Sequence, residues 1–289
     1  MTDILVTGLL LGATYALLAM GLTLQYGVSR IMNLASGEML VAGAFAAFWM
    51  FTAQQLNPML ALLFVVPLAF VSNWLLYRWL LRPLVRRAKS RGQLEVDAIL
   101  ATFGASFALV GLMRWAFGGE FFNYSFLAVP VELFGSPFGL NRVVAAVAAA
   151  LVCALLYIGL HGTRTGMAMR ALAVDPRSAG LVAIDVPTMS AFAFALGGAI
   201  SAAAGTILST FLTLDASIGV MFTLKALVIV IMGGVGDVRG AVVAALILGL
   251  AETAVATLVD PGLTLAAAYL LFLLVLLFRP QGLFGRSVR

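Results

Sequence analysis

Residues 4–24 read ILVTGLLLGATYALLAMGLTL, an apolar run of 21 residues with no charged side chain. An α-helix rises about 1.5 Å per residue and needs about 20 apolar residues to cross the hydrocarbon core of a bilayer, so this run predicts a membrane-spanning helix. The run is too long for the core of a signal peptide, and no basic segment precedes it. Similar apolar runs recur along the chain. They cover residues 39–51, 59–81, 97–117, 143–160, 188–212, 222–233, 240–258 and 264–278.

The composition agrees with a protein built mostly of such helices. Hydrophobic residues make up 63% of the 289 positions and charged residues 10%, whereas soluble domains carry about 25% charged residues. The sequence therefore predicts an all-α fold, a polytopic membrane helical bundle of about eight or nine passes, forming one domain over residues 1–289. The runs 39–51 and 222–233 are too short to span, which makes them candidates for broken or re-entrant helices.

Rare residue types exclude several kinds of chemistry. The chain has one cysteine, Cys153, and one histidine, His161, so it can form neither an intramolecular disulfide nor a paired-histidine metal motif. Neither of its two lysines, Lys89 and Lys225, follows a glycine, which excludes the Gly-Lys pair of a phosphate-binding loop. We therefore expect no metal, no cofactor bound by this chain, no ATPase site of its own and no enzymatic activity.

The basic residues predict the orientation in the membrane. The loops 82–96 and 161–187 and the tail 279–289 hold 11 of the 17 Lys and Arg residues, whereas the loop 118–141 has two glutamates and no cation. Short loops rich in Lys and Arg stay on the cytosolic side. We expect these three segments to be cytosolic and the N-terminus to lie outside. The net charge of +5 is then a signal of topology and not of nucleic-acid binding.

Four segments are unusually polar or rich in glycine for a membrane bundle. They are residues 27–38, 166–180, 225–241 and 277–285. Within the second, Asp175-Pro176 has the pattern of a helix N-cap followed by proline at the first helical position. This pair predicts that a new short helix begins there.

Together the four segments resemble the LivH-type permease subunit of ABC transporters for branched-chain amino acids, a binding-protein-dependent inner-membrane component family. Residues 33–38 are similar to its Asn-x-Ala-x-Gly-Glu motif, and Ser36 stands where the family often has histidine. Arg177 stands where the family often has glutamate after Asp-Pro. The other matches are Lys225-Ala226 followed by Gly233-Gly234-Val235-Gly236, and Arg279-Pro280-x-Gly282-Leu283-Phe284-Gly285.

The resemblance implies a multi-pass permease of a bacterial inner (plasma) membrane. Such a subunit moves its solute from an extracytoplasmic solute-binding protein into the cytoplasm by alternating access. Separate ABC ATPase subunits on the cytosolic side use the ATP. A second permease chain, related or identical, completes the transporter. Branched-chain amino acids, other amino acids, urea, amides and small carboxylates all fit the sequence as solutes.

The resemblance also implies that the loop 161–187 is the cytosolic coupling loop that docks on an ATPase. Its apolar side chains have no span to complete, so a partner surface would explain them; an ordinary amphipathic interfacial loop is the alternative. The residues expected to couple are Met167, Met169, Arg170, Leu172, Val174, Asp175 and Pro176.

Ionisable residues inside a membrane are costly and usually face a cavity or a partner. For Glu252 we expect an interhelical hydrogen bond. We expect Glu38 to cap a helix, to pack within the bundle or to meet the substrate path, and Lys225 to meet that path or to extend to the membrane surface. Residues 33–37 and 215–219 both interrupt helices, as in an inverted repeat with broken helices at its site. The candidate substrate-path or gate residues are Asn33, Ser36, Glu38, Asp215, Ser217 and Lys225.

Two other classes of function compete with this interpretation. An ion- or proton-coupled secondary transporter would need no ATPase, but the chain lacks the series of carboxylates or histidines suited to a proton relay. An intramembrane enzyme would need a histidine, cysteine or paired-carboxylate centre. Co-purification with a nucleotide-binding subunit separates the first interpretation from both.

Overall fold

The computed structural model describes residues 2–133 and 136–285 of the chain. Within them, eight helical segments are long and apolar enough to cross a membrane, which confirms the predicted all-α membrane bundle. The long helices are α1 (Thr2–Leu24), α2 (Ser36–Gln54), α3 (Pro58–Leu76), α5 (Arg91–Phe117), α6 (Leu140–Gly162), α9 (Val186–Leu208), α11 (Val238–Leu258) and α12 (Thr264–Phe278), the last of which a preceding 3₁₀ turn extends to the 18 residues Pro261–Phe278.

Shorter elements join and extend these helices. A π-helical turn, Gln25–Ser29, follows α1, another, Tyr77–Leu81, follows α3, and a 3₁₀ turn, Pro261–Leu263, precedes α12. An antiparallel hairpin, not anticipated from the sequence, joins α5 to α6. The short helices and strands are α4 (Arg82–Arg87), α7 (Arg164–Val174), α8 (Pro176–Leu181), α10 (Gly219–Gly233), β1 (Pro130–Leu133) and β2 (Ser136–Gly139).

The two apolar runs that are candidates for broken or re-entrant helices differ in the structure. The run 39–51 lies within α2, whose 19 residues are enough to cross the bilayer. The run 222–233 lies within α10, which has only 15 residues and is too short for a full span at about 1.5 Å per residue. The second therefore remains a short helix, as the sequence predicts.

Local sequence explains where several helices begin. The Asp237 side chain accepts hydrogen bonds from the backbone N–H groups of Arg239 and Gly240, which caps α11. At the predicted Asp175-Pro176 boundary, α7 ends at Val174 and α8 begins at Pro176. A carboxylate satisfies unpaired N–H groups at a helix start, and proline tolerates the first helical position.

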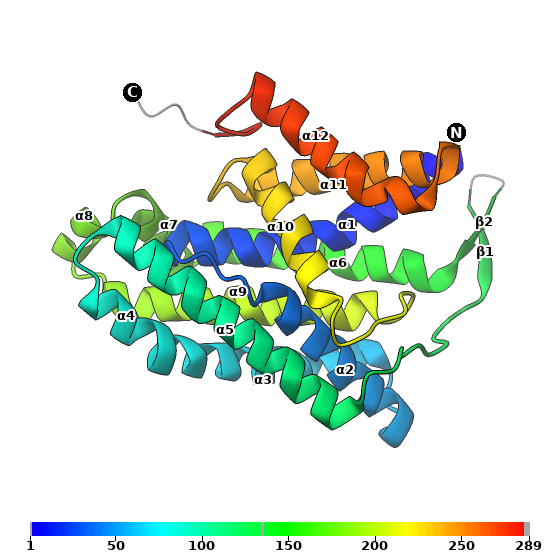
Figure 1. Ribbon diagram of the computed structural model, residues 1–289, viewed down its shortest axis with the longest axis horizontal. Coiled ribbons are helices and arrows are strands. Elements are labelled where there is room, and N and C mark those ends of the chain that lie inside the picture. The colour runs from blue at the N-terminus through cyan, green and yellow to red at the C-terminus, as the bar shows by residue number, and fades with distance from the viewer. Residues whose placement is uncertain (1, 134–135, 286–289) are drawn as a thin grey trace.

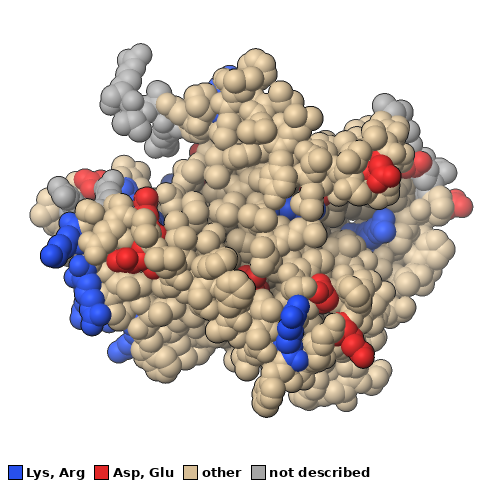
Figure 2. Space-filling view, in the orientation of Figure 1, with Lys and Arg blue, Asp and Glu red and all other residues tan. Residues whose placement is uncertain are grey.

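The long helices run roughly along one axis of the molecule (Figure 1). The N-terminal end of α1 and the β1–β2 hairpin lie at one end, and α4, α7 and α8 lie at the other. Figure 2 shows Lys and Arg side chains gathered at the end that carries α4 and α8. The loops 82–96 and 161–187 therefore share one end, while residues 286–289 of the predicted cytosolic tail lie outside the described residues.

Two parts of the chain are built alike and run in opposite directions. Helix α1 is followed by a non-helical segment, residues 30–35, and then α2; α9 is followed by residues 209–218 and then α10. We call these segments the first and the second break. Helices α1 and α9 run in opposite directions (Figure 1), and α1 packs against α11 as α9 packs against α3. This is the arrangement expected of an inverted repeat.

Candidate translocation site

The first break is fixed by buried amide groups. The Asn33 side chain accepts a hydrogen bond from the Ala35 N–H and donates one to the Gln25 Oε1 at 3.1 Å. Gln25 in turn donates to the carbonyl oxygen of Phe194 on α9 at 2.9 Å. Because Gln25 and Asn33 are both fully buried, their partners satisfy polar groups that would otherwise be costly in the interior.

The N-terminal ends of α2 and α10 touch each other directly. The Gly37 N–H donates to the Thr223 Oγ1 at 2.9 Å. A Cβ atom added at Gly37 would lie 1.9 Å from the Gly219 carbonyl oxygen, so only glycine permits this approach. The short helix α10 and the start of α2 thus meet at a contact of backbone on backbone, which we call the Gly37–Gly219 contact.

Glu38 lies beside this contact and is fully buried. The hydroxyl of Ser106 on α5 faces its carboxylate, but neither carboxylate oxygen has a partner in hydrogen-bonding geometry among the described residues. A Cβ atom at Gly219 would lie 3.1 Å from the Glu38 Oε1. The carboxylate therefore lies near the N-terminal ends of two helices, whose partial positive charges favour an anion.

The other polar residues predicted for the substrate path lie in different settings. Ser36 is fully buried and its hydroxyl has no partner among the described residues. Asp215 accepts hydrogen bonds from the backbone and side chain of the exposed Ser217, within the second break. In the described part of the chain, no hydrogen bond joins Asp215 or Ser217 to Glu38. The structure brings Gly219 to Glu38, but not these two residues.

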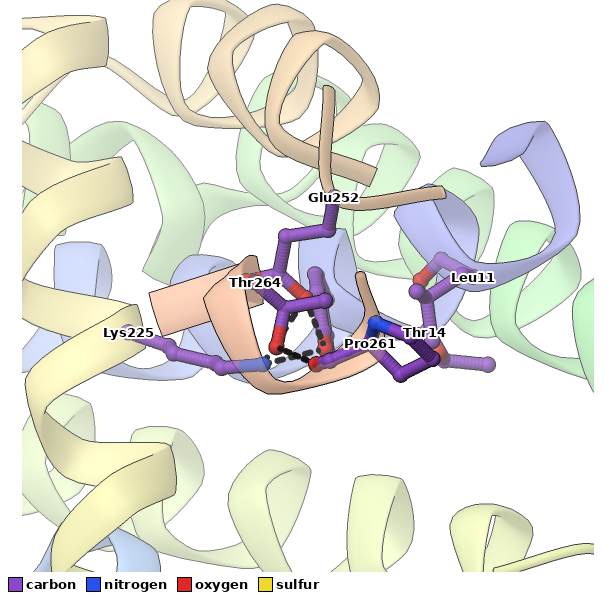
Figure 3. Close-up of polar contacts among 7 residues, drawn as sticks. Leu11, Thr14, Lys225, Glu252, Pro261 and Thr264 are labelled. Atoms are coloured by element: carbon purple, nitrogen blue, oxygen red, sulfur yellow. Dashed lines mark hydrogen bonds and ion pairs between the residues drawn. The ribbon is translucent and has the colours of Figure 1, made fainter. Parts of the chain in front are cut away.

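Lys225 forms a buried ion pair with Glu252 (Figure 3). The Lys225 Nζ on α10 lies 2.8 Å from the Glu252 Oε2 on α11. The hydroxyl of Tyr15 on α1 lies 2.8 Å from each of these two atoms, and the Lys225 Nζ is 4.9 Å from the centre of the Tyr15 ring. Lys225 therefore points into the bundle, not to a membrane surface, and three helices meet at this trio.

The two ends of the molecule differ in how open they are. At the end with α7, a cavity of about 1290 Å³, which we call the vestibule, reaches into the bundle. At the hairpin end, Phe45 and Phe48 of α2 pack against Phe122, and Tyr124 hydrogen-bonds to Ser209 at 2.8 Å. The cavity beside this aromatic cluster is only about 10 Å³, so no solute fits there. The polar residues that line the vestibule include Tyr26, Ser29, Arg30, Tyr157, Arg170 and Arg239.

Comparison with known proteins places the chain in a family. The sequence model described as "Branched-chain amino acid transport system / permease component" matches residues 4–279. The chain belongs to this family. It is therefore a membrane permease component of a transport system.

Similar proteins carry matching names. The chain is 29% identical to the high-affinity branched-chain amino acid transport system permease protein LivH of Salmonella typhimurium, over 96% of this chain and 94% of that protein. It is also 29% identical to BraD of Pseudomonas aeruginosa, a permease protein described in the same words, over 98% of this chain and 95% of that one. A solved structure, PsaBC from Streptococcus pneumoniae in complex with Fab, is 12% identical with a TM-score of 0.49, and it covers 97% of this chain and 94% of that chain.

The segment α7–α8 of this permease corrects part of the predicted coupling surface. Met169 and Leu172 are only 2% and 1% exposed and pack into the permease's own core. They are therefore not free to contact a partner, because at helical spacing their side chains face the bundle. Asp175 and Pro176 lie at the junction of the two helices. Five of the exposed residues in and just after these helices form what we call the α7–α8 surface: Met167, Arg170, Val174, Leu181 and Val182.

Several site residues of the permease were not identified from the sequence. Tyr15, Gln25 and Thr223 look like ordinary polar interruptions of apolar helices, and nothing in their spacing says which helix they face. The pairing of Lys225 with Glu252 had a usable signal, because two opposite charges interrupt consecutive apolar runs. The side chain of Arg177, the position that departs from the family pattern, lies outside those the structure describes.

Proposed function

We propose that this chain is the transmembrane permease subunit of an ATP-binding-cassette importer in a bacterial inner membrane. Its solute is a branched-chain amino acid or a related small polar molecule. The family match over residues 4–279 carries this proposal, and the names of the similar permeases support it. The end with α4, α7 and α8 then faces the cytosol, since short loops rich in Lys and Arg stay there.

The partners follow from what a permease needs and this chain lacks. No lysine follows a glycine in the sequence, so ABC ATPase subunits supply the phosphate-binding loops and use the ATP. A second permease chain, more readily a related one than an identical one, completes the path. An extracytoplasmic solute-binding protein delivers the solute at the hairpin end, and this chain itself binds no cofactor.

The geometry supports an alternating-access cycle. The aromatic cluster of α2 and Phe122 closes the hairpin end, while the vestibule opens the other end. Asn33, Ser36 and Glu38 lie between these two ends, at the start of α2. Separation of α2 from α10 at the Gly37–Gly219 contact would expose the Glu38 carboxylate to a passing solute. In this proposal the Lys225–Glu252 pair holds α10 on α11 and does not touch the solute.

The exposed α7–α8 surface fits the role of the ATPase docking site. Val174 is 72% and Leu181 88% exposed, and Met167 is exposed beside them. Arg170 lies at the edge of this apolar group and is also exposed. Helices buried against a soluble partner would remove these side chains from water, which is worth roughly 1.5–3 kcal/mol for each large apolar residue.

The test of the proposed function uses proteoliposomes that contain the permease with its co-expressed ATPase and partner permease subunits. We expect uptake of radiolabelled leucine, in the presence of a loaded binding protein, only when ATP is available to the ATPases. Uptake by the permease alone, driven by a proton or sodium gradient and indifferent to ATP, would instead identify an ion-coupled secondary transporter.

The docking site is tested separately by Val174→Asp/Leu181→Asp, with Val129→Asp as the matched control. Val129 is also exposed, at 57%, but lies just before the hairpin at the opposite end. We expect the double variant to reach the membrane in normal amount and to lose most of its co-purifying ATPase, whereas the control retains it. Full retention of the ATPase by the double variant would show that the α7–α8 surface is not the docking site.

A further inference from the structure

Arg30 links the first break to the end of α7. Its Nη2 lies 3.4 Å from the carbonyl oxygens of both Ala173 and Val174. These carbonyls belong to the last turn of α7, where unpaired acceptors give the helix a partial negative charge that favours a cation. A charged side chain of the membrane bundle is thereby attached to the segment that carries the α7–α8 surface.

The backbone of Arg30 is held in an unfavourable conformation. Its φ of 55° lies in the left-handed region, and its N–H donates to the Tyr26 carbonyl oxygen to close the π-helical turn. This conformation raises the free energy of any residue that has a side chain, and it persists only where the surrounding structure enforces it. The position therefore suits glycine on backbone grounds alone, and what arginine adds there is the contact of its side chain with the end of α7.

Between Arg30 and the Gly37–Gly219 contact, the first break is hydrogen-bonded to its neighbours from Met32 onward, and the Thr102 hydroxyl donates to the Met32 carbonyl oxygen. Three residues after Arg30, Asn33 is bonded to Gln25, which is bonded to α9. The next residue, Leu34, donates its N–H to the Thr102 hydroxyl of α5. Three residues after Leu34, Gly37 donates its N–H to the Thr223 hydroxyl of α10. A displacement of Arg30 is thus applied to a short, bonded segment and not to a loose loop.

We propose that Arg30 is a positioning residue that couples the movement of α7 to the Gly37–Gly219 contact. When the ATPases displace α7, its last carbonyls carry the Arg30 guanidinium with them, and the first break moves the start of α2 relative to α10. This inference rests on the proposed function, since it requires ATPases docked on the α7–α8 surface. Two sites are coupled when an element between them has two arrangements and both sites change the equilibrium between them.

The decisive variant is Arg30→Gly in the assembled transporter. Glycine accepts the left-handed backbone without strain, so the variant removes the side chain and leaves the fold in place. Arg30→Lys keeps the charge but replaces the planar guanidinium, whose Nη2 reaches both carbonyls, by a compact ammonium group. Arg87→Gln is the matched control, because Arg87 is an exposed arginine of α4 at the same end of the molecule but does not line the vestibule.

The quantity to measure is the amount of leucine imported per ATP hydrolysed, in proteoliposomes with equal amounts of bound ATPase. For Arg30→Gly we expect a fall of about tenfold, within the usual range of coupling factors between two sites. We expect a smaller fall for Arg30→Lys and no change for Arg87→Gln.

An unchanged ratio for Arg30→Gly, with the ATPases still bound, would overturn the role of Arg30 and leave the proposed function intact. A lower membrane abundance with an unchanged ratio would also overturn it, because the residue would then be purely structural. Failure of the wild-type chain to bind ATPases or to import leucine with ATP would instead refute the proposed function.

Discussion

Two buried glutamates of this permease occupy opposite electrostatic settings. Glu252 is 3% exposed and is bonded to Lys225 and Tyr15 from two other helices. Glu38 is fully buried near two helix ends, and its oxygens have no hydrogen-bond partner among the described residues. Both residues interrupt apolar sequence, yet the first has its charge balanced in place and the second does not.

The difference separates a structural from a mobile role. A buried ion pair with additional hydrogen bonds resists separation, because either partner left alone is strongly destabilised. A buried carboxylate held only by helix dipoles is stabilised less than one in an ion pair, and it gains hydrogen bonds when it meets water or a polar solute. We therefore assign Glu252 to the fixed part of the bundle and Glu38 to the part that opens.

The largest effect is expected for Lys225→Met. This change leaves the Glu252 carboxylate buried without its cation, which costs about 3–5 kcal/mol of unfolding free energy. Membrane abundance should fall, and so should the midpoint of thermal unfolding in detergent. The double variant Lys225→Met/Glu252→Gln should recover most of the loss, since Tyr15 can still donate to the amide oxygen. A single variant as stable as the wild type would show that the pair does not hold α10 on α11.

A smaller loss is expected for Gly37→Ala, which alters the surroundings of Glu38 and not its charge. The new Cβ would collide with the Gly219 backbone, and overpacking of this kind costs about 1–3 kcal/mol. Gly104→Ala is the control, because a Cβ there has nothing within 4 Å. Thermal unfolding of both variants in the same detergent measures the difference. Equal midpoints would contradict the close approach of α2 and α10.

Tyr15→Phe tests the remaining member of the trio around Glu252. The change removes two hydrogen bonds but leaves the ion pair with Lys225, and interhelical hydrogen bonds in membranes contribute about 1–2 kcal/mol at most. Unfolding in a series of SDS concentrations should show this modest loss while leucine uptake per molecule stays at the wild-type value. A collapse of uptake at normal stability would place Tyr15 in the solute path.

The smallest effect on stability is expected for Glu38→Gln. No ion pair is lost, so the unfolding free energy should change by less than about 1 kcal/mol, the size of one net hydrogen bond. Uptake should nevertheless fall at normal membrane abundance, because the amide cannot supply the charge that the carboxylate presents when the contact opens. The opposite outcome, lost abundance with normal uptake per molecule, would exchange the roles of the two glutamates.

Much of this fold follows from the sequence because bilayer spans impose a length and a composition. The extent of α2 was underestimated because its first turn, Ser36 to Glu38, is polar and lies inside the protein. The Asp175-Pro176 boundary was predicted correctly because local capping chemistry decides it. The hairpin at residues 130–139 was missed because its strands are four residues each and lie outside any span.

The candidate site was predicted less completely, because composition cannot tell an intramolecular contact from an intermolecular one. Met169 and Leu172 are apolar and lie outside the spans. This pattern is expected both of a docking surface and of a packed core. Only the direction of each side chain separates these two cases. The partner of Glu252 could not be predicted for the same reason, because each helix has several neighbours and the sequence does not say which of them a side chain faces.

The short helix α10 also determines how the permease responds to its lipids. Fifteen residues rise only about 22 Å, less than the roughly 30 Å hydrocarbon thickness of an average bilayer. Both ends of α10 are seated on protein, at Gly37 and at the Gly240 backbone. Helix α12 is also 15 residues long, but the 3₁₀ turn before it extends the span to 18 residues. Most of its large side chains are exposed, so it must match the acyl chains around it. Lipids of different chain length should therefore tilt α12 while α10 keeps its place.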